Sequence, residues 1–349
     1  MAQSDPPALA WFGGRLATGL LEVRHGQAAL EGLDSQGWWA VVVDYEGTVT
    51  AGRFDRIEKA PLPTGRPWSP LPGTWRSSLD RTAYEMAVTD VRRRIARGDV
   101  YQVNICRVLE HDLAEDADLL GLAAVTAAGN AAPYAGFLRL PGVELVCASP
   151  ELFLSRREGR VTTGPVKGTA ATPELLLPKD FDENVMIVDL ARNDLSRVSE
   201  PGSVGVTDLL ALEHHPGLVH LVSRVEGRLR PGTTWRLLLD ALMPPASVTG
   251  APKSSALRAI GDLEPVARGP YCGAVGWVDA DSLTAELAVG IRTFWAAREP
   301  SGGRVVRFGT GAGITWGSDP AGEWAETELK AARLVGLASA RRPSGTVLA

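Results

Sequence analysis

The sequence is poor in cysteine. Only three of its 349 residues are cysteines. They lie far apart in apolar contexts, so neither a metal-binding spacing nor a disulfide framework is expected. Free buried thiols are typical of a reducing cytoplasm, where we expect this protein to act. None of the three stands in a sequence typical of a catalytic nucleophile; they are Cys106, Cys147 and Cys272.

Long apolar runs and clustered positive charge are also missing. No apolar run approaches the roughly 20 residues that a membrane helix needs. The N-terminus, "MAQSDPPALAWFGG", lacks the basic segment and apolar core of a secretory signal. The chain has 41 acidic and 36 basic residues, a net charge of −5, and no long basic run. We therefore expect no membrane segment and no nucleic-acid binding.

The composition is that of an ordinary globular protein, with 45% hydrophobic and 22% charged residues. Residues 1–60 alternate short strand-like runs with turns, and the proline-rich stretch 61–78 is typical of a surface connector. We therefore assign 1–78 to an N-terminal β-rich segment and connector within the same fold. Residues 79–340 form the main region, and 341–349 form a frayed, disordered tail.

The pattern of strands and helices predicts the fold class. Strand signals come in blocks, including 38–47, a strand within 99–113 with alternating faces, and a hairpin across Pro141-Gly142. Separate strand blocks with helices between them favour an α+β fold with large antiparallel sheets over a regular βαβ repeat. Helices are predicted at 80–97, 180–197, 232–243, 252–263 and 320–340.

A lone lysine stands in the stretch "GPVKGT", residues 164–169. Lys167 lies between a Gly-Pro turn and a Gly-Thr step, with Val166 beside it. Lysine is usually found on solvated surfaces, so a loop lysine is one interpretation. A lysine held in a pocket for chemistry is the other, and the stretch alone leaves both open.

The last predicted helix carries Glu323, Glu326 and Lys330 at spacing i, i+3, i+7. This spacing places all three on one face of the helix. Two carboxylates can hold a hard cation such as Mg²⁺, and the lysine can meet a carboxylate of a ligand. The alternative is a solvated face with an i, i+4 ion pair.

Two further charged residues stand in apolar segments. Glu183 begins "ENVMIVDLARNDLSRV", a helix that is apolar nearly all round and expected to be mostly buried. It is either a metal ligand or a first-turn glutamate favoured by the helix dipole. Arg292 interrupts the strand "GIRTFW". It pairs with a structural acid or clamps a ligand carboxylate.

Ten segments between about 100 and 335 together resemble the chorismate-utilising enzymes. This family comprises the anthranilate synthase large subunit, aminodeoxychorismate synthase component I, and isochorismate and salicylate synthases. The segments occur in family order. They are "YQVNICR", "ASPELFL", "GPVKGT", "DENVMIVDLARNDLSRV", "VHLVS", "SVTGAPK", "GPYCGAVGW", "AVGIRTFW", "GTGAGI" and "EWAETELK".

The resemblance implies two large antiparallel sheets packed as a sandwich with flanking helices, and a site for chorismate and Mg²⁺. It implies that Glu183 and Glu326 hold the metal with Glu323 nearby, and that Glu151 is the general acid for the departing C4 hydroxyl. It also implies a set of substrate-binding residues: Thr169, His220, Thr249, Tyr271, Arg292, Gly311, Gly313 and Lys330.

The resemblance also decides between the two interpretations of Lys167. The comparable motif looks like Pro-x-Ala-Gly-Thr in anthranilate synthases and Pro-Ile-Lys-Gly-Thr in aminodeoxychorismate synthases. This chain has Pro-Val-Lys-Gly-Thr. The resemblance therefore implies that Lys167 is a nucleophile that attacks ring C2 before ammonia aminates C4. Gln102 stands where the water-adding members look as though they carry a lysine base, which disfavours those reactions.

The expected activity is that of an aminodeoxychorismate synthase serving p-aminobenzoate and folate or a related metabolite. No Cys-His-Glu glutaminase set is present, so a separate glutamine amidotransferase subunit is expected to supply ammonia. "LLEV" at 20–23 replaces the feedback motif Leu-Leu-Glu-Ser, and Pro245-Ala246 replaces family glycines. An anthranilate-type synthase and a non-catalytic chorismate-binding subunit are the alternatives.

Overall fold

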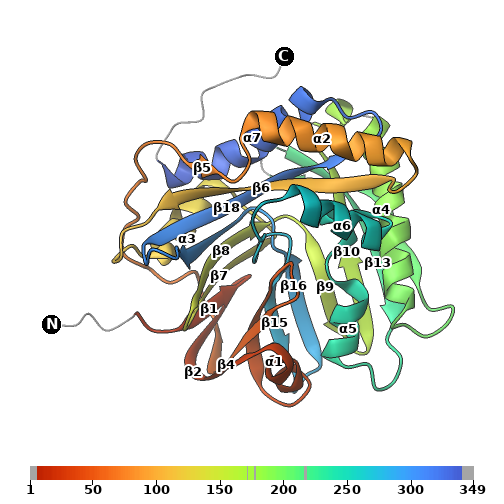
Figure 1. Ribbon diagram of the computed structural model, residues 1–349. Coiled ribbons are helices and arrows are strands. Elements are labelled where there is room, and N and C mark those ends of the chain that lie inside the picture. The colour runs from red at the N-terminus through yellow and green to blue at the C-terminus, as the bar shows by residue number, and fades with distance from the viewer. Residues whose placement is uncertain (1–5, 171, 177, 216–217, 340–349) are drawn as a thin grey trace.

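The structure is a computed structural model that describes residues 6–170, 172–176, 178–215 and 218–339 (Figure 1). Its strands pair antiparallel throughout the described part of the chain. Hydrogen bonds join them into one continuous network with two runs. The first run follows the order β12 (Gly205–His215), β13 (Leu218–Arg228), β11 (Val166–Ala170) with β10 (Arg160–Gly164), β9 (Leu152–Arg157), β16 (Thr284–Val289), β15 (Ala274–Asp279), β3 (Trp38–Val43), β4 (Val49–Lys59) and β2 (Arg15–His25).

The second run continues from β2 through its pairing with β1. It follows the order β1 (Leu9–Phe12), β7 (Tyr134–Leu140), β8 (Val143–Ser149), β17 (Thr293–Arg298), β18 (Arg304–Ile314) and β6 (Gln102–Asp112), with the short β5 (Arg76–Ser77) and β14 (Gly250–Ala251) on β6. The predicted α+β class with large antiparallel sheets is confirmed. The β1–β2 pairing joins the two expected sheets.

Helices cover the network on its outer faces. In Figure 1, α2 and α7 lie along β6 and β18, and α4 lies beside β10 and β13. Side-chain caps begin several of them: Asp80 accepts a hydrogen bond from the backbone N–H of Ala83 at 2.8 Å, and Asp319 from that of Gly322 at 2.8 Å. The helices are α1 (Gly26–Leu33), α2 (Arg81–Ala96), α3 (Leu119–Gly129), α4 (Pro178–Ser196), α5 (Trp235–Leu242), α6 (Lys253–Leu263) and α7 (Pro320–Ala338), with 3₁₀ turns η1 (Pro173–Leu175) and η2 (Ala246–Val248).

Two apolar clusters fill the interior. The larger one packs β3, β15 and β6 against α1, α2, α5 and α6. The smaller one lies under α3 and α7, where the rings of Phe294 and Phe308 are 4.7 Å apart. Because β6 lies between these layers, Gln102–Leu109 are all buried. The predicted strand is therefore present, and both of its alternating faces are buried over this stretch.

Most predicted helix ends lie within three residues of those observed, but some elements were not predicted. α1 has only eight residues, and α3 is apolar without a helical period, so neither gives a clear signal. The edge strand β12 mixes polar and apolar residues and was also missed. The predicted burial of α4 is wrong as well, because Val185 is 48% exposed and the helix covers β13 with one face only.

Within the described residues, no helix has both the length and the apolar character that crossing a membrane requires. The predicted tail 341–349 lies outside the described residues.

Candidate active site

Lys167 lies on a β-bulge. Strand β11 pairs with β13 through Val166 opposite Val222 and Thr169 opposite His220, with a register shift between the two pairs. The extra residue of a bulge redirects the neighbouring side chains out of the regular ladder. The Lys167 side chain is 17% exposed. It is therefore held in the protein and is not a freely solvated loop lysine.

The bulge depends on the glycine that follows. Gly168 has φ +88°, which L side chains rarely adopt. A Cβ at this position would lie 2.9 Å from Cβ of Asp180 and 3.2 Å from Cδ2 of Leu176. Gly168 therefore permits both the backbone conformation and the close approach of α4. This explains the Lys-Gly order in the motif.

Glu183 on α4 faces Lys167, with 3.9 Å between Oε2 and Nζ. The helix is fixed at this level by the fully buried Asn184. Its Nδ2 donates to the carbonyl of Leu221 on β13 at 3.0 Å, and its Oδ1 accepts from the hydroxyl of Ser223 at 2.5 Å. Side-chain bonds to the neighbouring strand therefore set the position of Glu183.

Glu151 follows β8 and is 4% exposed. Burial raises the pKa of its carboxyl group to about 7, although a hydrogen bond from Ser247, the charge of Lys167 and the backbone N–H of Val166 act in the opposite direction. A carboxyl group with such a pKa can hold a proton near neutral pH and donate it in a reaction. This matches the general-acid role that the resemblance implies.

Backbone hydrogen bonds join the turn of Glu151 to the turn of Arg292. The N–H of Val289 donates to the carbonyl of Glu151 at 3.0 Å, and the N–H of Ala148 donates to the carbonyl of Arg292 at 3.1 Å. The two segments lie far apart in the sequence but belong to one local structure. The structure thus brings the turn of Arg292 next to the turn of Glu151.

The guanidinium of Arg292 has no hydrogen-bond acceptor or ion-pair partner among the described residues. Burial and the positive charge of Arg333 lower its pKa. Its backbone is left-handed, with φ +51°. A partly buried cation without a partner costs free energy. An anionic ligand would offset this cost, so the structure favours the carboxylate clamp over the structural ion pair.

Helix α7 carries the other predicted charged residues and is fixed on β6 and β18. Arg107 on β6 is 2% exposed and donates to Oγ1 of Thr327 at 3.0 Å. Its guanidinium carbon lies 4.1 Å from the ring centre of Trp324. The hydroxyl of Thr310 on β18 donates to the carbonyl of Thr327 at 2.8 Å. These contacts hold one face of α7 over β18.

Lys330 links α7 to the glycine-rich strand. Its Nζ donates to the carbonyl of Gly311 at 3.0 Å and lies 2.7 Å from Oε1 of Glu326. This i, i+4 ion pair is the alternative that the helix spacing left open, and it coexists here with a contact to β18. Arg333, one turn further along α7, acts on the pKa of Arg292. Arg333 therefore brings positive charge of α7 toward Arg292.

The third predicted metal-site residue, Glu323, is turned toward the N-terminus of α7. Glu323 is 9% exposed and accepts a hydrogen bond from the hydroxyl of Ser318 at 2.5 Å. In the part of the chain that the structure describes, no three His, Cys, Asp or Glu residues converge as a metal-binding group. Glu183 and Glu326 offer oxygen ligands of the kind Mg²⁺ prefers, and this ion needs only one or two protein carboxylates beside its substrate. The donor chemistry therefore fits Mg²⁺.

The two predicted glycines on β18 lie against β6. A Cβ on Gly311 would lie 2.6 Å from Sγ of Cys106, and one on Gly313 would lie 2.4 Å from Nε2 of Gln102. Both positions therefore exclude a larger residue. Gln102 is 2% exposed, and its Oε1 has no hydrogen-bond partner within the described residues. A buried amide of this kind cannot act as a base.

Three further predicted residues occupy the interior. Tyr271 is 5% exposed, and its hydroxyl lies 3.9 Å from Sγ of Cys106. Thr249 is fully buried, and its hydroxyl donates to the carbonyl of Pro245 at 2.8 Å, which holds the loop containing the Pro245-Ala246 departure. His220 is 2% exposed on β13. The side chain of the last predicted residue, Thr169, is outside the described part.

Sequence reasoning missed Ser247 and Asn184. Ser247 is buried beside Glu151 and donates a hydrogen bond to its carboxyl group. Asn184 anchors α4 next to Glu183. The sequence could have identified Asn184, because a polar residue on the apolar side of a helix needs a hydrogen-bond partner. It could not have identified Ser247, since the loop that carries this residue has no regular period.

Comparison with known proteins identifies the family. The model of the chorismate binding enzymes matches residues 31–336. The chain is 38% identical over 305 residues to "Anthranilate synthase component 1" of Aeropyrum pernix, covering 84% of this chain and 68% of that protein. It is 32% identical over 318 residues to "Aminodeoxychorismate synthase component 1" of Klebsiella aerogenes, covering 85% and 68%.

Solved structures agree in fold. Anthranilate synthase component I from Streptococcus pneumoniae superposes with a TM-score of 0.78 at 24% identity, covering 96% of this chain and 94% of that one. A putative isochorismate synthase, DhbC, from Bacillus anthracis gives a TM-score of 0.78 at 24% identity, with 96% of both chains covered. The fold is thus that of anthranilate synthase component I. On these matches, the chain belongs to the family of chorismate binding enzymes.

Proposed function

We propose that this protein is an aminodeoxychorismate synthase, which converts chorismate and ammonia to 4-amino-4-deoxychorismate. The observation that supports this most directly is Lys167. It is largely buried on a bulge, 3.9 Å from Glu183, and its charge acts on the carboxyl group of Glu151. An amine placed beside a protonated carboxyl group suits nucleophilic attack coupled to departure of a hydroxyl group.

In the proposed reaction, Nζ of Lys167 forms a bond to ring C2 as the C4–oxygen bond breaks. Glu151 gives its proton to the departing oxygen, which leaves as water. Ammonia then forms a bond to C4, the ring double bonds shift back, and the C2–Nζ bond breaks. Glu151 regains a proton from the ammonium group formed at C4. The lysine amine is returned unchanged, so the steps balance.

Arg292, Lys330 and the backbone at Gly311 and Gly313 would hold the two carboxylates of chorismate. Arg292 is the strongest candidate among them because it has no counter-ion among the described residues. Glu183 and Glu326 would hold Mg²⁺, which would supply positive charge beside a substrate carboxylate. A glutamine amidotransferase partner would supply ammonia, consistent with the "component 1" names of the relatives. The product would serve p-aminobenzoate and folate formation in the cytoplasm.

An anthranilate-type synthase is the second candidate. The similarity to anthranilate synthase component 1 of Aeropyrum pernix, at 38% identity, favours it. The two reactions place nitrogen on different ring carbons. Purified protein with chorismate, Mg²⁺ and an ammonium salt therefore separates them when the products are identified by mass and by comparison with authentic standards.

The variant Lys167→Ala tests the nucleophile. We expect formation of 4-amino-4-deoxychorismate to fall by roughly 10³ or more while chorismate still binds, because the change removes the attacking atom and leaves Arg292 in place. Lys59→Ala, at an exposed end of β4, is the control and should retain full activity. Wild-type turnover in Lys167→Ala would rule out the nucleophile. A weaker affinity with normal turnover at saturating chorismate would show a steering role instead.

A further inference from the structure

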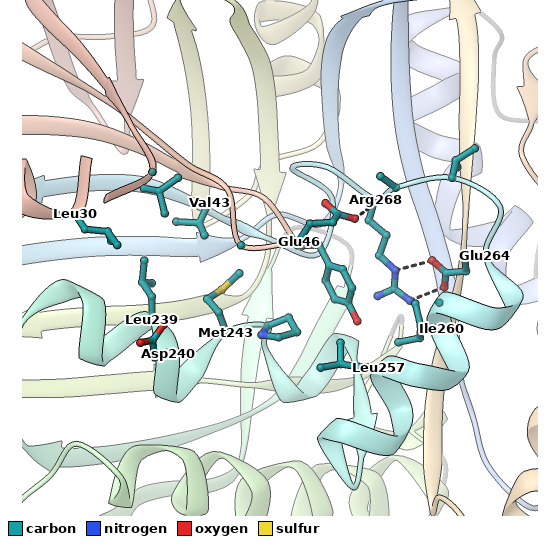
Figure 2. Close-up of a pocket in the computed structure, with 18 of the residues that line it drawn as sticks. Leu30, Val43, Glu46, Leu239, Asp240, Met243, Leu257, Ile260, Glu264 and Arg268 are labelled. Carbon is teal, nitrogen blue, oxygen red and sulfur yellow. Dashed lines mark hydrogen bonds and ion pairs between the residues drawn. The ribbon is translucent and has the colours of Figure 1, made fainter. Parts of the chain in front are cut away.

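A pocket of about 910 Å³ lies between α1, α5, α6 and the turn that joins β3 to β4 (Figure 2). None of the residues placed in the candidate active site lines it. Pockets that bind small molecules commonly measure 300–1,000 Å³. A space of this size, built from four separate elements, is therefore large enough for a small organic ligand.

About half of the wall surface is apolar. Figure 2 shows one group of side chains from α1, β3 and α5 facing a second group from α6, with Glu46 between them. Leu257 in the second group is 37% exposed, so part of this apolar surface is open to solvent. A ligand would need an apolar body to cover it. The apolar lining includes Leu30, Val43, Leu239, Met243, Leu257 and Ile260.

The buried guanidinium group of Arg268 in the pocket wall already has hydrogen-bond and ion-pair partners. Two nitrogens of Arg268 donate to Glu264, at 2.8 Å from Nε and 2.6 Å from Nη2. The guanidinium also donates to the carbonyls of Val248 at 2.9 Å and Asn104 at 2.8 Å. The ring of Tyr45 covers it, with 4.2 Å between the guanidinium carbon and the ring centre. Arg268 therefore offers little to an anionic ligand.

The second cation of the pocket is also paired. Nε of Arg236 lies 2.8 Å from Oδ2 of Asp240, and its Nη1 donates to Oε1 of Gln27 at 3.0 Å. Each arginine of the lining is thus matched by one acid. Each of these two ion pairs has no net charge, so the net charge of the pocket is set by its remaining acid.

That acid is Glu46, on the turn after β3. Its carboxylate accepts the backbone N–H groups of Arg268 at 2.8 Å and Gly269 at 3.1 Å, which fixes its position. No lysine, arginine or histidine in the described residues forms an ion pair with it. Burial together with the charge of Glu46 raises the pKa of the neighbouring Asp44 to about 6. The turn therefore carries negative charge that no cation of the protein balances.

We propose that this pocket binds a small organic cation, namely a protonated amine that carries an apolar body. The ammonium group would lie on Glu46, and the body would cover the apolar lining between α5 and α6. A carboxylate or phosphate ligand is disfavoured because both arginines are already paired. This site is separate from the proposed chorismate site and does not depend on the reaction assigned above.

The test uses three probes of similar size and different charge: 2-phenylethylammonium, the neutral 2-phenylethanol and the anionic 3-phenylpropionate. Binding of each to the full chain is measured by titration calorimetry at pH 7. We expect saturable binding of the ammonium probe with an affinity at least about fivefold above that of the other two, which corresponds to about 1 kcal/mol. Equal affinities for the three probes, or no saturable binding of the ammonium probe, would overturn the proposal.

Variants locate the site. Glu46→Gln removes the charge and keeps an acceptor for one of the two backbone N–H groups, so the preference for the ammonium probe should disappear. Leu257→Trp fills the apolar part from an exposed position and should weaken binding of the ammonium probe severalfold. Glu58→Gln, on the exposed far end of β4, is the matched control and should bind like the wild type. Unchanged binding in Glu46→Gln or in Leu257→Trp would contradict the proposed position.

Discussion

Glu151 is a carboxyl group that the fold keeps protonated near neutral pH. Burial is the main cause, and it outweighs the hydrogen bond from Ser247 and the charge of Lys167. The pKa of about 7 lies above the value of 4.5 for the unfolded chain. The folded state therefore binds this proton more tightly, and the stability that Glu151 contributes is present below pH 4.5 and lost as the pH rises toward 7.

Glu151→Gln should remove this pH dependence, because glutamine is neutral at every pH. The wild type should lose about 3 kcal/mol of unfolding free energy between pH 4.5 and 8 through this group alone. Urea unfolding at both pH values measures the loss, with Glu58→Gln as the control for an exposed glutamate. Turnover of Glu151→Gln should fall by at least about 100-fold if the residue is the general acid. If the unfolding free energies of variant and wild type changed equally with pH, the raised pKa of Glu151 would be contradicted.

Burial disfavours the charged form of Arg292, as it does that of Glu151. Burial and Arg333 lower its pKa, so folding works against its positive charge. Such a residue contributes little to stability in the free protein, which agrees with the ligand-binding role proposed for it. Its proposed ligand is a carboxylate of chorismate.

Arg292→Met should therefore separate binding from stability. We expect the free energy of unfolding to stay equal or rise. Chorismate affinity should fall roughly 30-fold or more, since removing one partner of a buried charge pair costs about 2 kcal/mol or more. Equilibrium binding and urea unfolding measure the two effects. Arg258→Met, on α6, is the control. A variant that unfolds more easily but binds chorismate normally would show that Arg292 has a structural role.

At the scale of single elements, the bulge of β11 does most to build the site. It turns Lys167 out of the ladder, and Gly168 makes room for α4, which carries Glu183. The chain offers a matched comparison in Gly159. That glycine also has a positive φ, +74°, but a Cβ there would meet nothing within 4 Å.

Gly168→Ala should therefore cost more than Gly159→Ala. Both changes strain the backbone by about 1–2 kcal/mol, and only Gly168→Ala adds a clash with Asp180 and Leu176. We expect Gly159→Ala to keep full turnover and Gly168→Ala to lose at least about tenfold, as Lys167 and α4 move apart. Turnover of both variants at equal folded fraction is the measurement. Equal activity of the two would show that the bulge geometry does not matter.

The elements also show what the sequence can and cannot predict. Helices with a cap and a clear period, such as α2 after Asp80 and α7 after Asp319, were predicted closely. The bulge at Lys167 was not, because an extra residue in a strand pairing depends on a partner strand fifty residues away in sequence. Nor can the sequence reveal that Glu151 meets Ser247 or that Arg292 lacks a counter-ion. Both facts depend on packing between distant segments.

On the scale of the whole molecule, the ion pair between Glu264 and Arg268 joins several parts of the fold. Glu264 accepts the backbone N–H of Cys106 at 2.8 Å, and Arg268 holds the carbonyls of Asn104 and Val248. Cys106 pairs with Gly311 across β6 and β18, and Asn104 pairs with Gly313. The same two side chains line the pocket beside Glu46. The wall of this pocket is therefore bonded directly to the strand beside the proposed substrate site.

The source of nitrogen is also a property of the whole molecule. Release of ammonia from glutamine by a cysteine requires an accessible thiolate. All three cysteines of this chain are buried. Burial raises the pKa of Cys147, and that of Cys272 lies well above its usual value. The pKa of Cys106 is lowered by Cys272 and Arg268, but this thiol lies beneath Gly311 and cannot reach a ligand from outside.

We therefore expect this chain to aminate chorismate with an ammonium salt and to give no product with glutamine alone. Initial rates with the two nitrogen sources, at equal chorismate and Mg²⁺, measure the difference. Activity with ammonium should rise with pH as more free ammonia forms, until deprotonation of Glu151 above pH 7 opposes it. Treatment with iodoacetamide is the control and should leave the ammonium-dependent rate unchanged, because all three thiols are buried. Glutamine-dependent turnover by the purified chain would contradict this prediction. Turnover that appears only after a glutamine amidotransferase is added would support the proposed partner.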